Sequence, residues 1–209
     1  MIVRRSTAEI AVMRRAGRLV AEVLGLVEES LRPGVSTAHL DEIAEGHIRK
    51  AGGVPSFKGY NGYPSSICIS IDREVVHGIP GHRTIADGQV VSIDAGAIIE
   101  GYHGDAAYTA GVGQISDAAT RLIEVTERSL WAGIDQLTKG NRLNEVGRAV
   151  QQVAEAAGYS VVRVYASCQV TPAFALKVRV ENALDRRYEP VNGYPQPGTG
   201  IFGSAEIRF

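Results

Sequence analysis

An internal repeat constrains the fold of this chain more than any other feature of its sequence. The turn glycines Gly34 and Gly52 recur 106 positions later as Gly140 and Gly158, so 18 positions separate the two breakers in both copies. Other residues recur in the same register, namely Leu24 as Leu130, Leu31 as Leu137 and Ala51 as Ala157. A fixed register across two breakers indicates an internal duplication and predicts two halves related by pseudo-twofold symmetry.

Two helices are predicted at the start of the first copy. Residues 6–9, Ser-Thr-Ala-Glu, can form a capping box, and apolar residues recur behind it at helical spacing. Pro33-Gly34 ends this long helix, and either Ser36 or Thr37 can cap a second helix that Gly52-Gly53 terminates.

Strands follow, and the last two form a hairpin that carries paired carboxylates. Residues 65–71 predict a strand, residues 89–93 another, and residues 105–112 the return strand, with Glu100-Gly101 and Gly104 as turn residues. In an antiparallel hairpin with a four-residue loop at 98–101, Asp94 and Asp105 are directly opposed on one face, with Cβ atoms roughly 4.5–5.5 Å apart.

Two like charges that face each other favour a shared cation. Ile93 precedes Asp94 and Ala95-Gly96 follow it, so the carboxylate is set in apolar surroundings, where a charge is costly unless paired or coordinated. The spacing therefore suggests a shared divalent metal. The alternative is a pair of solvated charges on the outer face of the hairpin.

The composition excludes several classes of protein. With 22 basic and 23 acidic residues, the chain lacks the basic field that nucleic acids or anionic membranes attract, so neither is an expected partner. Cys68 and Cys168 show no C-x-x-C spacing, which argues against a zinc knuckle or a disulfide framework and favours a reducing cytoplasm. No run of 18 apolar residues occurs, so neither a signal peptide nor a spanning helix is predicted.

The motifs resemble those of type I methionine aminopeptidases over about residues 7–163. The matching segments are residues 60–70, 77–80, 92–96 and 101–105. The resemblance implies the pita-bread fold: an α/β (α+β) architecture with pseudo-twofold symmetry and a central antiparallel sheet with helices on one face. The duplication agrees with that architecture.

The resemblance also implies a site with two divalent metal ions, which Co, Mn, Fe or Zn could supply. Asp94 and Asp105 match the first two metal ligands of the family. His77 matches the catalytic histidine that contacts the substrate's amide nitrogen. Tyr60, Tyr63 and Cys68 match the pocket for the methionine side chain.

Each assignment has a simpler alternative. His77 could be a loop histidine that bonds local backbone, Tyr60 and Tyr63 aromatics that flank a turn, and Cys68 a small buried apolar residue. His103 lies two residues before Asp105 and could face the same side of a strand as a third ligand, although a loop position is the stronger expectation.

The second half of the predicted site has no counterpart. A second copy of the carboxylate hairpin would fall at 195–218, and the chain has no histidine after His103. One histidine and two glutamates that the resemblance implies are therefore missing, since Glu181, Glu189 and Glu206 lie in no matching motif. We expect an incomplete catalytic region at 1–164 and a β-rich tail of unrelated or diverged origin at 165–209.

The tail has its own pattern. Apolar and polar residues alternate over 174–180, and the chain ends on Phe209. Residues 172–209 resemble the last hairpin of a TonB-dependent outer-membrane receptor. The alternative is a diverged second half of the aminopeptidase fold. Two strands cannot close a barrel, so no membrane association is expected.

The sequence thus predicts a metal-dependent hydrolase that removes the N-terminal methionine from nascent peptides, with activity impaired by the missing ligands. The alternative is a non-catalytic truncated or chimeric protein that binds at most a peptide N-terminus or a partner. A creatinase- or prolidase-like hydrolase would share the fold, but the motifs at 60–71 and 77–80 favour the methionine-specific branch.

Overall fold

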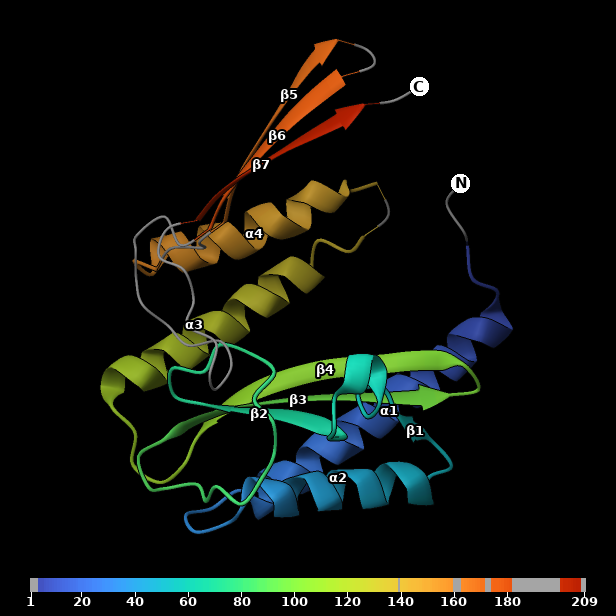
Figure 1. Cartoon of the computed structure of the whole chain (residues 1–209), viewed down its shortest axis with the longest axis vertical. Helices are drawn as coiled ribbons and strands as arrows, with labels where there is room; N and C mark the ends of the chain where they lie inside the picture. Colours follow the sequence, from blue (N-terminus) through green and yellow to red (C-terminus); the bar gives the residue numbers. More distant parts are fainter. Residues whose placement is uncertain (1–3, 139, 160–162, 172–173, 182–199, 208–209) are drawn as a thin grey trace. The chain divides into compact units, whose positions relative to one another are not determined.

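The computed structural model describes residues 4–138, 140–159, 163–171, 174–181 and 200–207 (Figure 1). The chain divides into two compact units, and the division falls between Thr120 and Arg121. The two units are described one after the other.

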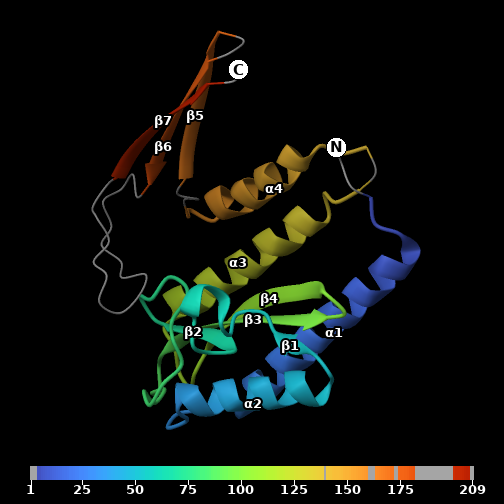
Figure 2. The ribbon, with the colours of Figure 1, turned by 45° about the vertical axis from the view of Figure 1, so that its right-hand side comes forward.

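The first unit is a small antiparallel sheet with two helices on one face (Figures 1 and 2). Its elements are α1 (Thr7–Ser30), α2 (Thr37–Lys50), β1 (Val54–Pro55), the short 3-10 turn η1 (Tyr60–Gly62), β2 (Ile67–Ile71), β3 (Val90–Ile99) and β4 (Tyr102–Gly111). The central strand β3 pairs with β4 along its whole length, with β2 through residues 91–95 and with β1 through residues 97 and 98. The predicted helices on one face of an antiparallel sheet are confirmed.

Helix α1 begins where its capping box predicts. The Ser6 hydroxyl accepts the Glu9 N–H at 3.3 Å, and the Glu9 carboxylate accepts the Ser6 N–H at 2.7 Å. Two otherwise unpaired groups at the helix start are thereby satisfied. Helix α2 is capped by Ser36, whose hydroxyl accepts the His39 N–H at 3.2 Å, and not by Thr37. The Thr37 side chain is buried and bonds a distant loop instead.

The core lies between the helices and the sheet. Odd-numbered residues of β3 point toward the helices and are buried, as alternation along a strand requires. The fully buried side chains of this core include Val20, Val23, Val27, Leu40, Ile48, Ile67, Ile69, Ile85, Val91 and Ile93. Even-numbered residues of β3 therefore face away from the helices.

The hairpin register differs from the prediction. Ile99 pairs with Tyr102, so the loop is the two-residue turn Glu100-Gly101 and not a four-residue loop. Both turn residues have positive φ, 49° and 81°, which matches the strand twist as in a type I′ turn. Asp94 consequently pairs with Ala107 and Asp105 with Gly96, so the predicted direct opposition is wrong while the shared face is correct.

Gly104 is likewise no turn residue. It lies inside β4, and a Cβ atom there would stand 2.5 Å from the carbonyl carbon and oxygen of Ala16 in α1. The helix backbone therefore packs directly on the strand at this point, and only glycine leaves the space.

The second unit contains most of α3 (Asp117–Ile134), α4 (Leu143–Ala156) and an antiparallel sheet of β5 (Arg163–Thr171), β6 (Phe174–Glu181) and β7 (Gly200–Ile207) in the order β5-β6-β7. Helices α3 and α4 touch at Gly133, where a Cβ would lie 2.9 Å from Cγ2 of Val150. Both limits of α4 lie 106 positions after those of α2, as the predicted duplication requires.

Part of the predicted tail lies outside the described residues. Strand β6 coincides with the alternating segment at 174–180, but residues 182–199 and Phe209 are among those not described. Within the described residues, no helix combines the length and the apolar character that a membrane span requires.

Candidate metal and substrate site

The face of the sheet turned away from the helices carries the predicted metal ligands. Asp94 of β3 pairs directly with Cys68 of β2, and Asp105 of β4 pairs with Gly96. Because paired residues share a face and residues two apart along a strand do too, all three functional side chains lie on the same side. Asp94 is half-buried and Asp105 is exposed.

The surroundings of Asp94 disfavour its charged form. Burial raises the pKa of Asp94, and the negative charge of Asp105 raises it further, while His77 acts in the opposite direction. Burial also raises the pKa of the Cys68 thiol, with Asp94 and Asp105 adding to the effect.

The loop that carries His77 is held at Gly78. Gly78 donates its N–H to the buried Ser70 hydroxyl at 3.1 Å, and its carbonyl accepts the Ile69 N–H at 2.9 Å and the Tyr63 hydroxyl at 3.1 Å. A Cβ at this position would lie 2.1 Å from the Ile69 carbonyl oxygen, so no other residue fits. His77 itself has a φ of 61° and an exposed side chain.

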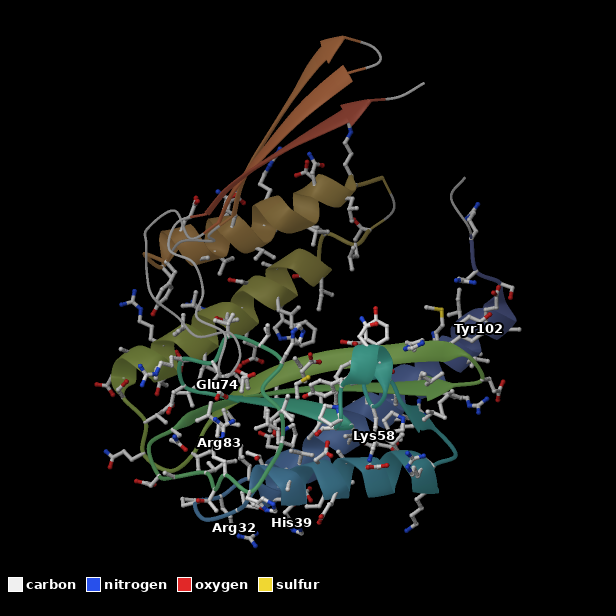
Figure 3. The ribbon with its side chains drawn as sticks, in the orientation of Figure 1. Arg32, His39, Lys58, Glu74, Arg83 and Tyr102 are labelled. Atoms are coloured by element: carbon white, nitrogen blue, oxygen red, sulfur yellow. The ribbon has the colours of Figure 1, made fainter. Side chains whose placement is uncertain are left out.

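Two further anchors hold the rest of this loop. The Thr37 hydroxyl donates to the Gly81 carbonyl at 3.0 Å and accepts the Gly81 N–H at 2.9 Å. Arg83 donates to both carboxylate oxygens of Glu74, one of them at 2.9 Å, and the two side chains meet in Figure 3. Burial alone would raise the pKa of Glu74, but hydrogen bonds from Arg83 and the Ile71 N–H outweigh it and the pKa is lowered.

The predicted pocket residues lie at different depths. Tyr60 is 72% exposed in η1, while Cys68 is buried in β2. The Tyr63 hydroxyl donates to the carbonyls of Ile67 and Gly78, both at 3.1 Å, and burial raises its pKa. The Tyr63 hydroxyl therefore links the start of β2 to the histidine loop. This role is separate from the predicted role of its ring in the pocket.

His103 lies in β4 and not in a loop. It shares a face with Asp105, two residues on, and its Nδ1 atom lies 3.0 Å from the Ser56 hydroxyl. Among the described residues, no three His, Cys, Asp or Glu side chains gather closely enough to hold a metal ion, so His103 does not complete the site.

Sequence reasoning missed several residues that support the site. Asp41 of α2 accepts the N–H groups of Ser66 and Ile67 at 2.8 and 2.9 Å and so fixes the start of β2. Burial raises the pKa of Asp41, although these two bonds act against that effect. Ser70, Thr37 and the Glu74–Arg83 pair were also missed, because their partners lie in distant or irregular segments that no local pattern marks.

Two carboxylates on one strand-paired face are a donor set that suits hard divalent cations. The fold and this donor set are those expected of a metallohydrolase. The model of metallopeptidase family M24 matches residues 11–186, and the chain belongs to this family. Membership in a metallopeptidase family implies a divalent metal cofactor.

Curated relatives are similar over most of this chain. A methionine aminopeptidase of Clostridium acetobutylicum is 48% identical over 166 residues, which cover 79% of this chain and 66% of that protein. Methionine aminopeptidase 1 of Mycobacterium tuberculosis is 49% identical over 158 residues, covering 75% of this chain and 59% of that protein. The chain thus spans less than two thirds of the length of either of these two relatives.

Solved structures share the architecture. The methionine aminopeptidase of Rickettsia prowazekii superposes with a TM-score of 0.78 at 28% identity, covering 99% of this chain and 96% of that one. Aminopeptidase P of Escherichia coli gives a TM-score of 0.64 at 26% identity, over 73% of this chain and 34% of that one. The predicted pita-bread fold is confirmed by these neighbours.

The family match also bears on the tail. It continues to residue 186, beyond the point near Val164 where the motifs stop. Nothing in these comparisons supports the predicted likeness of residues 172–209 to an outer-membrane receptor.

Proposed function

We propose that this chain acts as a metal-dependent aminopeptidase that removes the N-terminal methionine from nascent proteins in the cytoplasm. The observation that carries the proposal is the shared face of Asp94 and Asp105 beside Cys68, with the His77 loop fixed next to β2. The 48% identity to a methionine aminopeptidase over 79% of this chain supports the same substrate class.

The residues divide into three roles. Asp94 and Asp105 would hold the divalent metal, which when bound supplies an activated water and a Lewis acid for the scissile carbonyl. His77, exposed at the edge of this face, would contact the amide nitrogen of the substrate and steady it as the bond breaks. Tyr60, Tyr63 and Cys68 would line the pocket for the methionine side chain.

The raised pKa of Asp94 has a consequence for metal binding. A carboxylate must be ionised to ligate, so protons compete with the metal at this site over a pH range above that of an ordinary aspartate. Two carboxylates alone also give few ligands. We therefore expect weak metal binding and turnover well below that of an enzyme with a full ligand set.

The second candidate is a non-catalytic protein that binds peptide N-termini on the same face. It would use the pocket residues and His77 without water activation. For both candidates we propose that residues 1–164 form the aminopeptidase-like region. Residues 165–209 are then a tail, either of unrelated origin, as a receptor-like hairpin would be, or of diverged origin.

The deciding experiment measures metal stoichiometry and cleavage of a Met-Ala peptide with added manganese or cobalt. Wild type, Asp94→Asn and Asp105→Asn are compared with Asp135→Asn, a control that removes an exposed carboxylate of the second unit. We expect less than one metal per chain and slow turnover, both lost in the two site variants and kept in the control.

Other outcomes would change the proposal. About two metals per chain with rapid turnover would show that further residues complete the site, contrary to the expected impairment. Peptide binding without turnover in any metal would favour the non-catalytic candidate. Turnover that survives both site substitutions would overturn the assignment of Asp94 and Asp105.

A further inference from the structure

We infer that the Ser70 and Tyr63 hydroxyls are positioning groups for His77: they fix the backbone of Gly78, and Gly78 sets the position of the exposed imidazole next to it. The inference rests on the proposed function for the role of His77. Ser70 acts through the histidine and not on the substrate, and the Tyr63 hydroxyl adds the same role to the pocket role proposed for its ring.

The buried Ser70 hydroxyl contacts the backbone N–H of Gly78. Ser70 is 4% exposed, and its hydroxyl accepts the Gly78 N–H at 3.1 Å across eight residues of sequence. A buried N–H without an acceptor is costly, so this hydrogen bond holds the loop in place. Ser70 pairs with Ser92 in the sheet and lies two residues from Cys68, on the site face.

The carbonyl of Gly78, in the next peptide group, is held as well. The Gly78 carbonyl accepts both the Ile69 N–H and the Tyr63 hydroxyl, and the missing side chain lets Gly78 lie directly on the backbone of β2. Each hydrogen-bonding group of Gly78 therefore has a partner on or beside β2. Gly78 cannot shift without breaking several hydrogen bonds together.

His77 depends on the anchored Gly78 because few other contacts hold the histidine. Its φ of 61° is a strained conformation for a residue with a side chain, which persists only where the surroundings impose it. The imidazole forms no hydrogen bond with the described residues, and the nearest loop anchors, at Glu74 and Gly81, lie three residues before it and four after it. The anchored backbone of Gly78 thus determines the position of the His77 side chain.

The test uses Ser70→Ala and Tyr63→Phe, with Ser92→Ala as the matched control. Ser92 lies opposite Ser70 on the same face, but its hydroxyl bonds Thr109 at 2.8 Å and not the loop. For Ser70→Ala we expect kcat on a Met-Ala peptide to fall about tenfold to hundredfold with little change in KM, since misplacing a catalytic group costs rate more than binding. The control should stay within about twofold.

A double-mutant cycle with His77→Ala separates positioning from general damage. If Ser70 acts through His77, the loss caused by Ser70→Ala disappears once His77 is absent. An equal loss with and without His77 would overturn the inference. Tyr63→Phe should behave as Ser70→Ala does, which guards against a folding defect peculiar to one variant.

A readout without turnover keeps this test apart from that of the proposed function. The chain has five histidines, and the imidazole nitrogen signals of His77 can be assigned in NMR spectra by their loss in His77→Ala. Ser70→Ala and Tyr63→Phe should shift or broaden these signals alone, and Ser92→Ala should not. Unchanged His77 signals in both variants would overturn the inference. Shifted His77 signals in a protein without peptidase activity would support the inference and contradict the proposed function.

Discussion

Asp94 and Asp105 are diagonal neighbours on one face of the β3–β4 hairpin, because Asp94 pairs with Ala107 and Asp105 with Gly96. Diagonal positions lie roughly 7–8 Å apart, so the two carboxylates can reach toward a common point without clashing head-on. Gly96 has no side chain, and the segment at Ser56 and Phe57 packs over it: a Cβ on Gly96 would lie 2.8 Å from Cβ of Ser56 and 2.9 Å from Cε1 of Phe57. A neighbouring loop therefore packs against the face that carries the two aspartates.

Substitution of Asp94 by Asn should stabilise the metal-free protein at neutral pH. The folded-state pKa of Asp94 is raised, so between about pH 4 and that raised value the folded state keeps a proton that the unfolded chain has released. Wild-type stability therefore falls as pH rises through this window, and an uncharged Asn removes the fall. Urea unfolding from pH 4 to 8 measures the effect.

The same variant should lose its response to metal. A divalent ion at 100 times its dissociation constant stabilises the wild type by about 2.7 kcal/mol if it binds only the folded state. Asp94→Asn should show a much smaller gain, and Asp135→Asn the wild-type gain. An equal metal effect in all three proteins would mean that the ion binds elsewhere.

Replacement of Gly78 by Ala should be among the most damaging single-methyl changes in the first unit. The new Cβ would stand 2.1 Å from the Ile69 carbonyl oxygen, so the loop must leave β2 and break its hydrogen bonds. We expect a loss of about 3 kcal/mol or more in the free energy of unfolding, measured in urea.

The control for this change is Gly81→Ala in the same loop, where a Cβ would meet nothing within 4 Å. It should change stability by less than about 1 kcal/mol. Similar losses at both positions would show that the loop tolerates no methyl at all, contrary to the close contact at Gly78.

Gly104→Ala and Gly17→Ala should have opposite effects although the two glycines touch. A Cβ on Gly104 would lie 2.5 Å from Ala16 and 2.6 Å from the Gly17 nitrogen, forcing α1 away from β4, at a cost of about 1–3 kcal/mol. A Cβ on Gly17 meets nothing within 4 Å, and Ala favours a helix over Gly by about 1 kcal/mol. Thermal unfolding midpoints of the two variants measure these effects. Equal shifts in both would contradict the close packing of α1 on β4 at Gly104.

Glu45→Gln should remove a part of the stability that is lost in acid. Hydrogen bonds from Lys58 and Arg49 lower the pKa of Glu45 to about 2, from 4.5. Its contribution is present above pH 4.5 and disappears as pH falls toward 2, and solvent screening keeps it to about 1 kcal/mol or less. Acid titrations of stability should differ between wild type and Glu45→Gln, and coincident curves would contradict this contribution.

Local patterns predicted the helices well because their signals are short-range. The capping box at Ser6 and Glu9 and the helix breaker Pro33-Gly34 each lie within a few residues of the helix end that they set. The pattern that marks α2 is likewise local, and it recurs in α4. The shared face of Asp94 and Asp105 followed in the same way, since strand alternation depends only on whether their loop holds an even number of residues. The family's motifs then gave the fold.

The sequence by itself therefore determined the element order, the duplication and the faces of the strands. Only the tertiary structure decided the register of the hairpin, because two positive φ angles at Glu100 and Gly101 select a two-residue turn that sets the aspartates diagonally. It also decided which residues hold the histidine loop. Ser70 and Thr37 bond backbone groups of that loop, and Arg83, within the loop, bonds the Ile69 carbonyl of β2. Such contacts depend on how separate elements pack rather than on any periodic pattern.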